Sequence, residues 1–211
     1  MRITILTDNP KSWVIPYIKG LKEKLSENHE ISHIFSSKDI KKGDLMLILS
    51  CEKILKDYHL SFHKSNIVVH PSELPKGKGW SPLAWQVLEG ENRIPLTLFE
   101  ANDKVDDGDV YQVDYIELNG SELNDEIKHL QGLKTIEMIL RYVDGFESRE
   151  GIPQTGDETF YEKRTFKDSE LNIYKNIDEQ FNLLRVVDNE RYPAFFLKDG
   201  VKYVLKIYKE D

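Results

Sequence analysis

Short apolar runs alternate with amphipathic segments along the first two thirds of the chain. Runs of this kind are typical of strands in a covered sheet, and we expect strands at 2–7, 30–35, 45–49, 67–69, 95–100 and 110–118. Apolar residues at helical spacing and helix-boundary residues predict helices at 13–25, 54–63, 82–88 and 122–143. The alternation favours a Rossmann-like α/β fold, a mostly parallel sheet with helices on both faces.

The pattern changes after residue 146. The segment 147–160 is polar and contains two glycines and a proline, which is typical of a linker or long loop. Beyond it, we expect a small C-terminal helix at 176–187 and a β-hairpin with strands 194–197 and 201–207. The expected organisation is a main domain at 1–146, a linker at 147–160 and a C-terminal extension at 161–211.

Composition narrows the functional classes. The chain has 211 residues, 39% hydrophobic and 31% charged, with a net charge of −8, which disfavours nucleic-acid binding because that binding depends on basic residues. A single cysteine, Cys51, excludes an internal disulfide framework and a cysteine-rich zinc site. The N-terminus resembles a first strand more than a signal peptide, and no apolar run is long enough to span a bilayer. We therefore expect a cytoplasmic protein with no metal, nucleic-acid or membrane partner.

Polar residues follow several expected strands. In an open parallel sheet, ligands bind beyond the carboxyl ends of the strands, where Asp8, Asn9, Ser50, Cys51 and His70 fall. The glycine-rich dinucleotide fingerprint and the Walker pattern are both absent after the first strand, which reads TDNPKS. Taken alone, a histidine at a strand end is more often structural than catalytic.

An acidic loop gives the histidine a candidate partner. In EANDKVDDGDVY, residues 100–111, four aspartates surround a glycine at the end of another expected strand. The loop could be an acidic turn or a weak calcium site, but its spacing does not fit the EF-hand pattern. A carboxylate beside His70 would orient the imidazole for general acid–base chemistry.

Two stretches carry a family resemblance. VHPSELPKGKGWSPLAWQVLEGE and IPLTLFEANDKVDDGDVY, which span residues 68–111 almost without gaps, resemble the signature of the folate-dependent formyltransferases. Residues 161–205 resemble the segment that follows the catalytic domain in methionyl-tRNA and UDP-amino-sugar formyltransferases. The resemblance implies a formyltransferase catalytic domain at 1–146 and an enzyme that moves a formyl group from 10-formyltetrahydrofolate to a primary amine, with no metal.

The resemblance also implies catalytic roles. By motif position, His70 is the family's histidine and Asp106 its aspartate. The family's asparagine, two residues before the histidine, is replaced by Val68, and Asn66 lies two residues further back on the same strand face, too far to substitute directly. Three interpretations stay open: another donor serves with His70 and Asp106, the enzyme is slower, or the site has lost catalysis.

Further roles follow from the same resemblance. The implied folate-binding residues are Cys51, Ile54, Leu55, Leu74 and Asp103, and the implied acceptor-binding residues are Lys76, Lys78, Trp80, Asn182 and Arg185. Each has a plainer interpretation: the two lysines could be solvated surface residues, the apolar residues could pack a helix, and the others could brace the fold. For Trp85 bracing is the favoured interpretation.

The acceptor amine is an expectation from resemblance alone. Methionyl-tRNA is disfavoured by the acidic composition and the short C-terminal part, and glycinamide ribonucleotide by the absence of a glycine-rich phosphate loop. A nucleotide-linked 4-amino-4,6-dideoxy sugar remains, UDP-linked rather than dTDP-linked, as in the formyltransferases that act on pseudaminic acid precursors. The alternatives are an inactive binding module and an enzyme for another small amine. The apolar hairpin packs on the main domain or forms a homodimer.

Overall fold

A six-stranded sheet forms the centre of the protein. In the computed structural model, which describes residues 1–210, the strand order is β2-β1-β3-β4-β6-β7. These strands comprise β1 (Arg2–Leu6), β2 (Glu30–Ile34), β3 (Leu45–Ile48), β4 (Ser65–His70), β6 (Arg93–Glu100) and β7 (Val110–Glu117). The first four are parallel, and β6 runs antiparallel to its neighbours β4 and β7. The predicted mostly parallel α/β sheet is confirmed.

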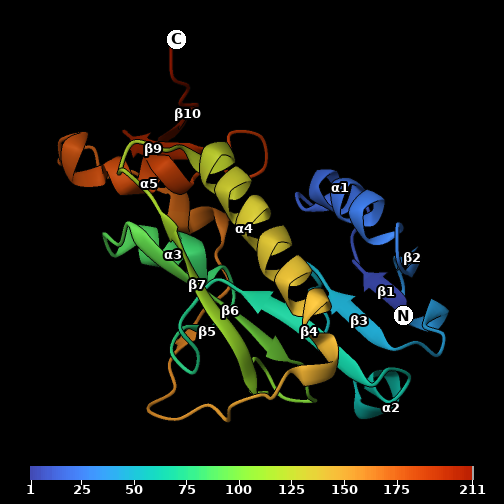
Figure 1. Ribbon diagram of the computed structural model, residues 1–211. Helices are drawn as coiled ribbons and strands as arrows, with labels where there is room; N and C mark the ends of the chain where they lie inside the picture. The colour runs from blue at the N-terminus through green and yellow to red at the C-terminus, as the bar shows by residue number, and fades with distance from the viewer. Residues whose placement is uncertain (211) are drawn as a thin grey trace.

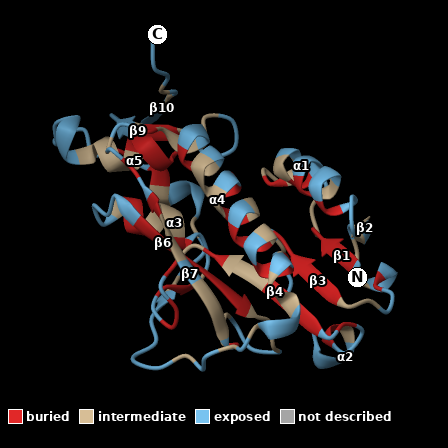
Figure 2. Cartoon of the chain, viewed as in Figure 1, coloured by how far each residue is buried: buried red, intermediate tan, exposed pale blue. Residues whose placement is uncertain are grey.

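The larger helices pack on one face of this sheet. Helices α1 (Ile15–Leu25) and α4 (Asn124–Asp144) cross it side by side, and Figure 1 shows α4 as the long helix in front of the strands. Their apolar sides meet odd-numbered strand residues such as Ile3, Leu47 and Ile67, which are buried between sheet and helices. Figure 2 shows the buried strands below helices whose outer turns are exposed.

The opposite face has a thinner cover. Even-numbered strand residues, including Leu6, Met46 and Ile48, form a second cluster with Leu55 and Leu60. Leu60 belongs to the short helix α2 (Asp57–Leu60), and Val68 of β4 packs at the edge of the cluster. Successive strand residues point to opposite faces, so His70 lies on the same face as Val68.

The C-terminal extension packs on the main domain. Helix α3 (Pro82–Leu88) contacts α5 (Phe181–Val186), and α5 shares a small apolar cluster with the hairpin β9 (Ala194–Lys198) and β10 (Val201–Leu205). The hairpin turns at Asp199 and Gly200, whose φ angles of 52° and 77° suit a tight hairpin turn. The prediction of a small helix and hairpin is confirmed, although four hairpin side chains, Leu197, Val201, Tyr203 and Val204, are about half exposed.

Two predicted helices are shorter than expected. The segment 54–63 is helical only at α2 because the Asp8 carboxylate accepts the backbone N–H groups of Glu52 and Lys53, which holds the preceding chain in a non-helical path. The helix expected at 176–187 begins at Phe181, after a 3₁₀ turn at Asp178–Gln180. There the Gln180 amide donates to carbonyls of the preceding loop, which competes with helix formation.

A second small sheet was not predicted. Strands β5 (Lys78–Gly79) and β8 (Phe160–Tyr161) pair in parallel, so that the end of the segment expected to be a linker or long loop binds the loop after His70. Each strand has only two residues, and therefore neither carries an apolar pattern that a sequence analysis could detect.

Candidate active site

His70 ends β4 with its ring almost fully enclosed. The residue is 7% exposed, and its Nε2 lies 2.8 Å from the carbonyl oxygen of Gly77. A carbonyl only accepts hydrogen bonds, so Nε2 carries the proton. In the neutral ring the lone pair is therefore on Nδ1, which faces Asp106. The loop after β4 thus fixes both the ring plane and the tautomer.

Asp106 reaches His70 from the loop between β6 and β7. Its Oδ2 lies 3.7 Å from His70 Nδ1 and accepts the backbone N–H of Gly79 at 2.8 Å. Asp106 adopts a left-handed backbone, φ 47°, a conformation that aspartate tolerates better than most residues. Two residues on, a Cβ at Gly108 would lie 1.6 Å from the Glu100 carbonyl oxygen, so that only glycine fits there. The structure brings the two predicted catalytic residues together.

Lys78 does not have its predicted role. Its ammonium group is buried, 1% exposed, and binds Asp107 and Glu158, each at 2.8 Å. Burial opposes the charge, but the hydrogen bonds to the two carboxylates outweigh it and raise the pKa of Lys78. In this arrangement both ion pairs occupy the ammonium group, and Lys78 is not among the residues that line the cleft, so its placement does not support the expected acceptor role.

A cleft of about 600 Å³ opens beside the His70–Asp106 pair. One wall of this cleft is apolar and carries Ile48, Val68, Phe99, Ala101 and Val105, with Ile54, Leu55 and Cys51 beside them. Ile54 is 51% exposed there, whereas Leu55 is buried in the cluster under the wall. Burial raises the pKa of the Cys51 thiol to about 12, and the nearby Asp8 charge adds to the effect.

The position expected to hold an asparagine is part of this apolar wall. Val68 lines the cleft beside His70. Asn66 is 5% exposed, and its amide donates to the Leu60 carbonyl while its backbone N–H donates to the Glu100 carboxylate. Because these bonds hold Asn66 at the start of β4, it does not replace the missing amide, as the sequence had indicated.

Six basic residues are part of the cleft lining. Lys163 lies 3.3 Å from Glu52 and 4.1 Å from the ring centroid of Trp80, a predicted acceptor-binding residue that lines the cleft. Lys53, Lys104, Lys128, Arg164 and Arg191 also line it. The sequence shows 161–165 as a basic cluster but gives no sign that it lies opposite Trp80, because that contact joins segments 83 residues apart by their numbering.

Other predicted site residues lie elsewhere. Arg185 is 1% exposed and binds Glu122 and Asn182, so this pair braces α5. Neither residue lines the cleft, so their placement does not support the expected acceptor role. Leu74 is buried in the loop after His70, and neither it nor the exposed Lys76 and Asp103 is among the residues that line the cleft.

Trp85 has the bracing role favoured from the sequence. Its indole N–H donates to the Glu162 carbonyl at 2.9 Å.

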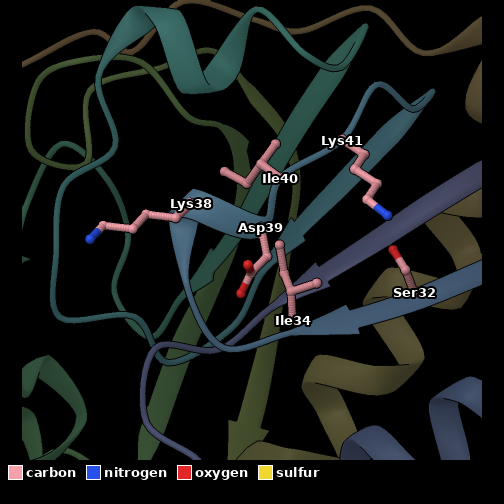
Figure 3. Close-up of a pocket in the computed structure, with 6 residues that line it drawn as sticks. All are labelled: Ser32, Ile34, Lys38, Asp39, Ile40 and Lys41. Atoms are coloured by element: carbon pink, nitrogen blue, oxygen red, sulfur yellow. The ribbon is translucent and has the colours of Figure 1, made fainter.

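A second hollow, of about 350 Å³, lies at the β2 edge of the sheet. Figure 3 shows its lining, which includes Ser32, Ile34, Lys38, Asp39 and Lys41. It contains neither His70 nor Asp106, both of which line the larger cleft. Residues 1–210 contain no group of three or more His, Cys, Asp or Glu residues placed to hold a metal ion. No helix within the same range has the length and apolar character needed to cross a membrane.

Comparison with known proteins places this geometry in a family. The family model described as formyl transferase matches residues 8–135. Methionyl-tRNA formyltransferase of Clostridium beijerinckii is 25% identical over 147 residues, which cover 68% of this chain and 48% of that protein. The enzyme of the same name from Thermodesulfovibrio yellowstonii is 24% identical over 189 residues, 87% of this chain and 59% of that one. The chain thus spans about half the length of these curated relatives.

Solved structures share the fold. Methionyl-tRNA formyltransferase from Clostridium thermocellum superposes with a TM-score of 0.84 at 18% identity, covering 100% of this chain and 94% of that one. A sugar N-formyltransferase from a Shewanella species gives 0.76 at 15% identity, with 100% and 98% covered. HypX from Aquifex aeolicus in complex with tetrahydrofolic acid gives 0.81 at 18% identity, with 98% and 37% covered. The family model matches more than half of this chain, so the chain belongs to the formyl transferase family.

Proposed function

We propose that this protein is a folate-dependent N-formyltransferase, which transfers a formyl group from 10-formyltetrahydrofolate to the amine of a nucleotide-linked 4-amino-4,6-dideoxy sugar. The observation that carries the proposal is the enclosed His70–Asp106 pair beside a cleft with one apolar wall and six basic lining residues. Formyl transfer itself is supported by membership of the family.

The apolar wall suits the formyl donor. A reduced pterin is a flat ring system, and the side chains of Val68, Phe99 and Ile54 offer it apolar contact close to His70. The half-exposed Ile54 is an apolar group on the wall that such a ligand would cover. Tetrahydrofolic acid is bound by the HypX protein of the same fold, which supports a folate site here.

His70 and Asp106 supply the acid–base chemistry. When the amine attacks the formyl carbon, a C–N bond forms, negative charge develops on the formyl oxygen and the nitrogen must lose a proton. His70 Nδ1 carries the lone pair and can take up a proton, and the imidazolium that results faces the Asp106 carboxylate. The bond from the formyl carbon to the folate nitrogen then breaks, and a proton returns to that nitrogen.

The basic residues that line the cleft suit an anionic acceptor. Six lysine or arginine residues line the cleft, whereas its acidic lining residues are Glu52, Asp106 and Asp188. Two of these acids are paired with lysines, Glu52 with Lys163 and Asp188 with Lys128. A diphosphate would find Lys163 and Arg191 here, a role we assign to them in place of Lys78. The sugar N-formyltransferases of the same fold support this acceptor class.

The test is direct transfer to a panel of acceptors. The protein is incubated with 10-formyltetrahydrofolate and UDP- or dTDP-linked 4-amino sugars, with methionyl-tRNA and free amino sugars as comparisons, and each acceptor is weighed by mass spectrometry. We expect a UDP-linked amino sugar to gain one formyl group. Transfer to methionyl-tRNA alone would contradict the proposed sugar acceptor. Transfer to no acceptor, together with no folate binding, would contradict the enzyme and favour the alternative of an inactive binding module, for which the valine at position 68 is the supporting feature.

A further inference from the structure

The segment expected to be a linker or long loop contains a strap that binds the two loops next to the candidate active site. We define the strap as residues 152–161. Nearly all of its residues are exposed, including Ile152 at 71% and Phe160 at 60%, so the strap adds little to the apolar core. Its polar groups instead bind two loops, the loop after β4 and the loop between β6 and β7, which hold His70 and Asp106 in place.

One end of the strap holds the loop that carries Asp106. Ile152 and Val110 exchange two backbone hydrogen bonds, of 2.9 and 2.8 Å. Next, the Gln154 side-chain amide donates to the carbonyl oxygens of Asp106, at 3.0 Å, and Gly108, at 2.8 Å. These two carbonyls flank the left-handed turn that directs the Asp106 carboxylate toward His70. A single amide group therefore closes this turn.

The other end of the strap holds the loop that carries the partner of His70. The Thr159 hydroxyl accepts the N–H of Gly77 at 2.8 Å, and the carbonyl of Gly77 accepts His70 Nε2. The Thr159 carbonyl accepts the N–H of Lys78 at 2.9 Å, and β8 then pairs with β5 as far as Gly79, whose N–H donates to Asp106. Gly77 binds His70 and Gly79 binds Asp106, and the strap contacts both of these glycines.

A buried ion pair joins the two loops through the strap. The Lys78 ammonium bridges Asp107, next to Asp106, and Glu158, next to Thr159. Lys78 itself lies between Gly77 and Gly79, the residues that bind His70 and Asp106. A shift of the strap would therefore move both members of the pair, whose separation of 3.7 Å leaves little tolerance.

We propose that the strap sets the geometry of His70 and Asp106, with Gln154 as the positioning residue that holds Asp106. The expected change in kcat rests on the proposed function, whereas the expected change in the surroundings of His70 does not. Gln154 does not touch the reacting atoms, and it acts through the backbone of the Asp106 turn. Removing its two hydrogen bonds lets the turn relax and the carboxylate move away from Nδ1.

The experiment compares Gln154→Ala and the nearly isosteric Gln154→Glu with the wild type. Gln180→Ala is the matched control, because Gln180 also donates to three backbone carbonyls, in a loop that does not line the cleft. The chemical shifts of the His70 ring are measured by NMR at one fixed pH in the protein without substrates, and the His70→Ala variant assigns the signals. The values of kcat and KM are measured with a formyl donor and an amino-sugar nucleotide.

Both Gln154 variants are expected to change the chemical shifts of the His70 ring and to lower kcat by about 10- to 100-fold with KM nearly unchanged, because a displacement of about 1 Å costs on that order. Gln180→Ala is expected to leave all three quantities as they are. Wild-type values for either Gln154 variant, or a rise in KM alone, would overturn the proposal. If the protein transfers no formyl group, the NMR chemical shifts of the His70 ring still decide the role of the strap, so the two failures are distinguishable.

Discussion

At the residue scale, the motif predicted that His70 and Asp106 form a pair, but it did not predict the surroundings of the residues near them. The positions of His70 and Asp106 were identified by the resemblance of residues 68–111 to a family motif, since a histidine at a strand end carries little information by itself. The burial of Lys78 was not predicted, since one of its two partners, Glu158, lies 80 positions away and the contact needs the complete fold. A lysine between two glycines looks solvent-exposed in sequence, and here it is fully enclosed.

Val68 is the residue at which the site departs from the family pattern. Introducing an amide by Val68→Asn places a hydrogen-bond donor on the cleft wall beside His70, where charge develops on the formyl oxygen. We expect turnover to rise by roughly 10-fold, since oxyanion donors are worth at least that much, and thermal stability to fall because Val68 packs against the apolar cluster of the α2 face. Single-turnover rates and thermal unfolding check both effects.

Val68→Ala is the control for lost packing, because it removes apolar contact without adding a donor. A folded Val68→Asn variant that is slower than both Val68→Ala and the wild type would contradict this account and would mean that the cleft is rebuilt around valine.

Cys51 lies on the same wall, and its chemistry follows from its pKa. Burial raises that pKa from 9.0 to about 12, so the thiol stays protonated at neutral pH and gains reactivity only in alkali. We expect iodoacetamide to label the folded protein at pH 7.5 at least about 10-fold more slowly than the unfolded protein, since the thiolate is the reacting form. Labelling of the folded protein at the unfolded rate would contradict the enclosed environment of Cys51.

At the element scale, periodicity predicted the strands and long helices well and the short elements poorly. The helix predicted at 122–143 forms at Asn124–Asp144, because its apolar stripe persists over several turns. The two-residue strands β5 and β8 have no such signal and form because long-range backbone pairing is available. The linker prediction for 147–160 rested on composition, which records polarity but not the carbonyls and carboxylates that polar groups meet.

The Lys78 ion pair stabilises the contact between strap and loops. Lys78→Met keeps an unbranched side chain, one atom shorter, and removes the charge, leaving Asp107 and Glu158 without their shared partner. We expect the free energy of unfolding to fall by about 2 kcal/mol, the scale of lost hydrogen bonds to charged groups, because both carboxylates stay partly hydrated. Denaturant unfolding measures this change.

The control for that measurement is Lys76→Met, which neutralises an exposed lysine two residues away. A surface change of this kind is expected to shift stability by less than about 0.5 kcal/mol. Equal losses for the two variants would show that Lys78 contributes no more than a surface charge.

Glu100, where β6 ends, makes stability depend on pH. Burial raises its carboxyl pKa above 4.5 in spite of hydrogen bonds from Ser65, Asn66 and Tyr111. A raised folded-state pKa means that its contribution is present below the ordinary value and is lost as pH rises through the raised one. We therefore expect the wild type to lose more stability than Glu100→Gln between pH 4.5 and 7, measured by denaturant unfolding. Equal losses would contradict the raised pKa.

At the scale of the whole molecule, the protein is acidic but the lining of its large cleft is rich in basic residues. The net charge of −8 disfavoured nucleic acid from composition alone, yet six of the basic residues converge at the cleft. Composition averages over the surface, and the convergence depends on packing the C-terminal extension against the main domain. A homodimer stays a prediction. The outer side chains of the hairpin are about half exposed, and no other part of residues 1–210 covers them.

The most direct test of the central claim is formyl transfer by the wild type, His70→Ala and Asp106→Ala in one mass-spectrometric assay with 10-formyltetrahydrofolate and a UDP-linked 4-amino sugar. The account predicts a formylated sugar nucleotide with the wild type and a loss of at least about 100-fold in turnover with each variant, because the enclosed pair handles the proton and the developing charge. Full activity in either folded variant would contradict it.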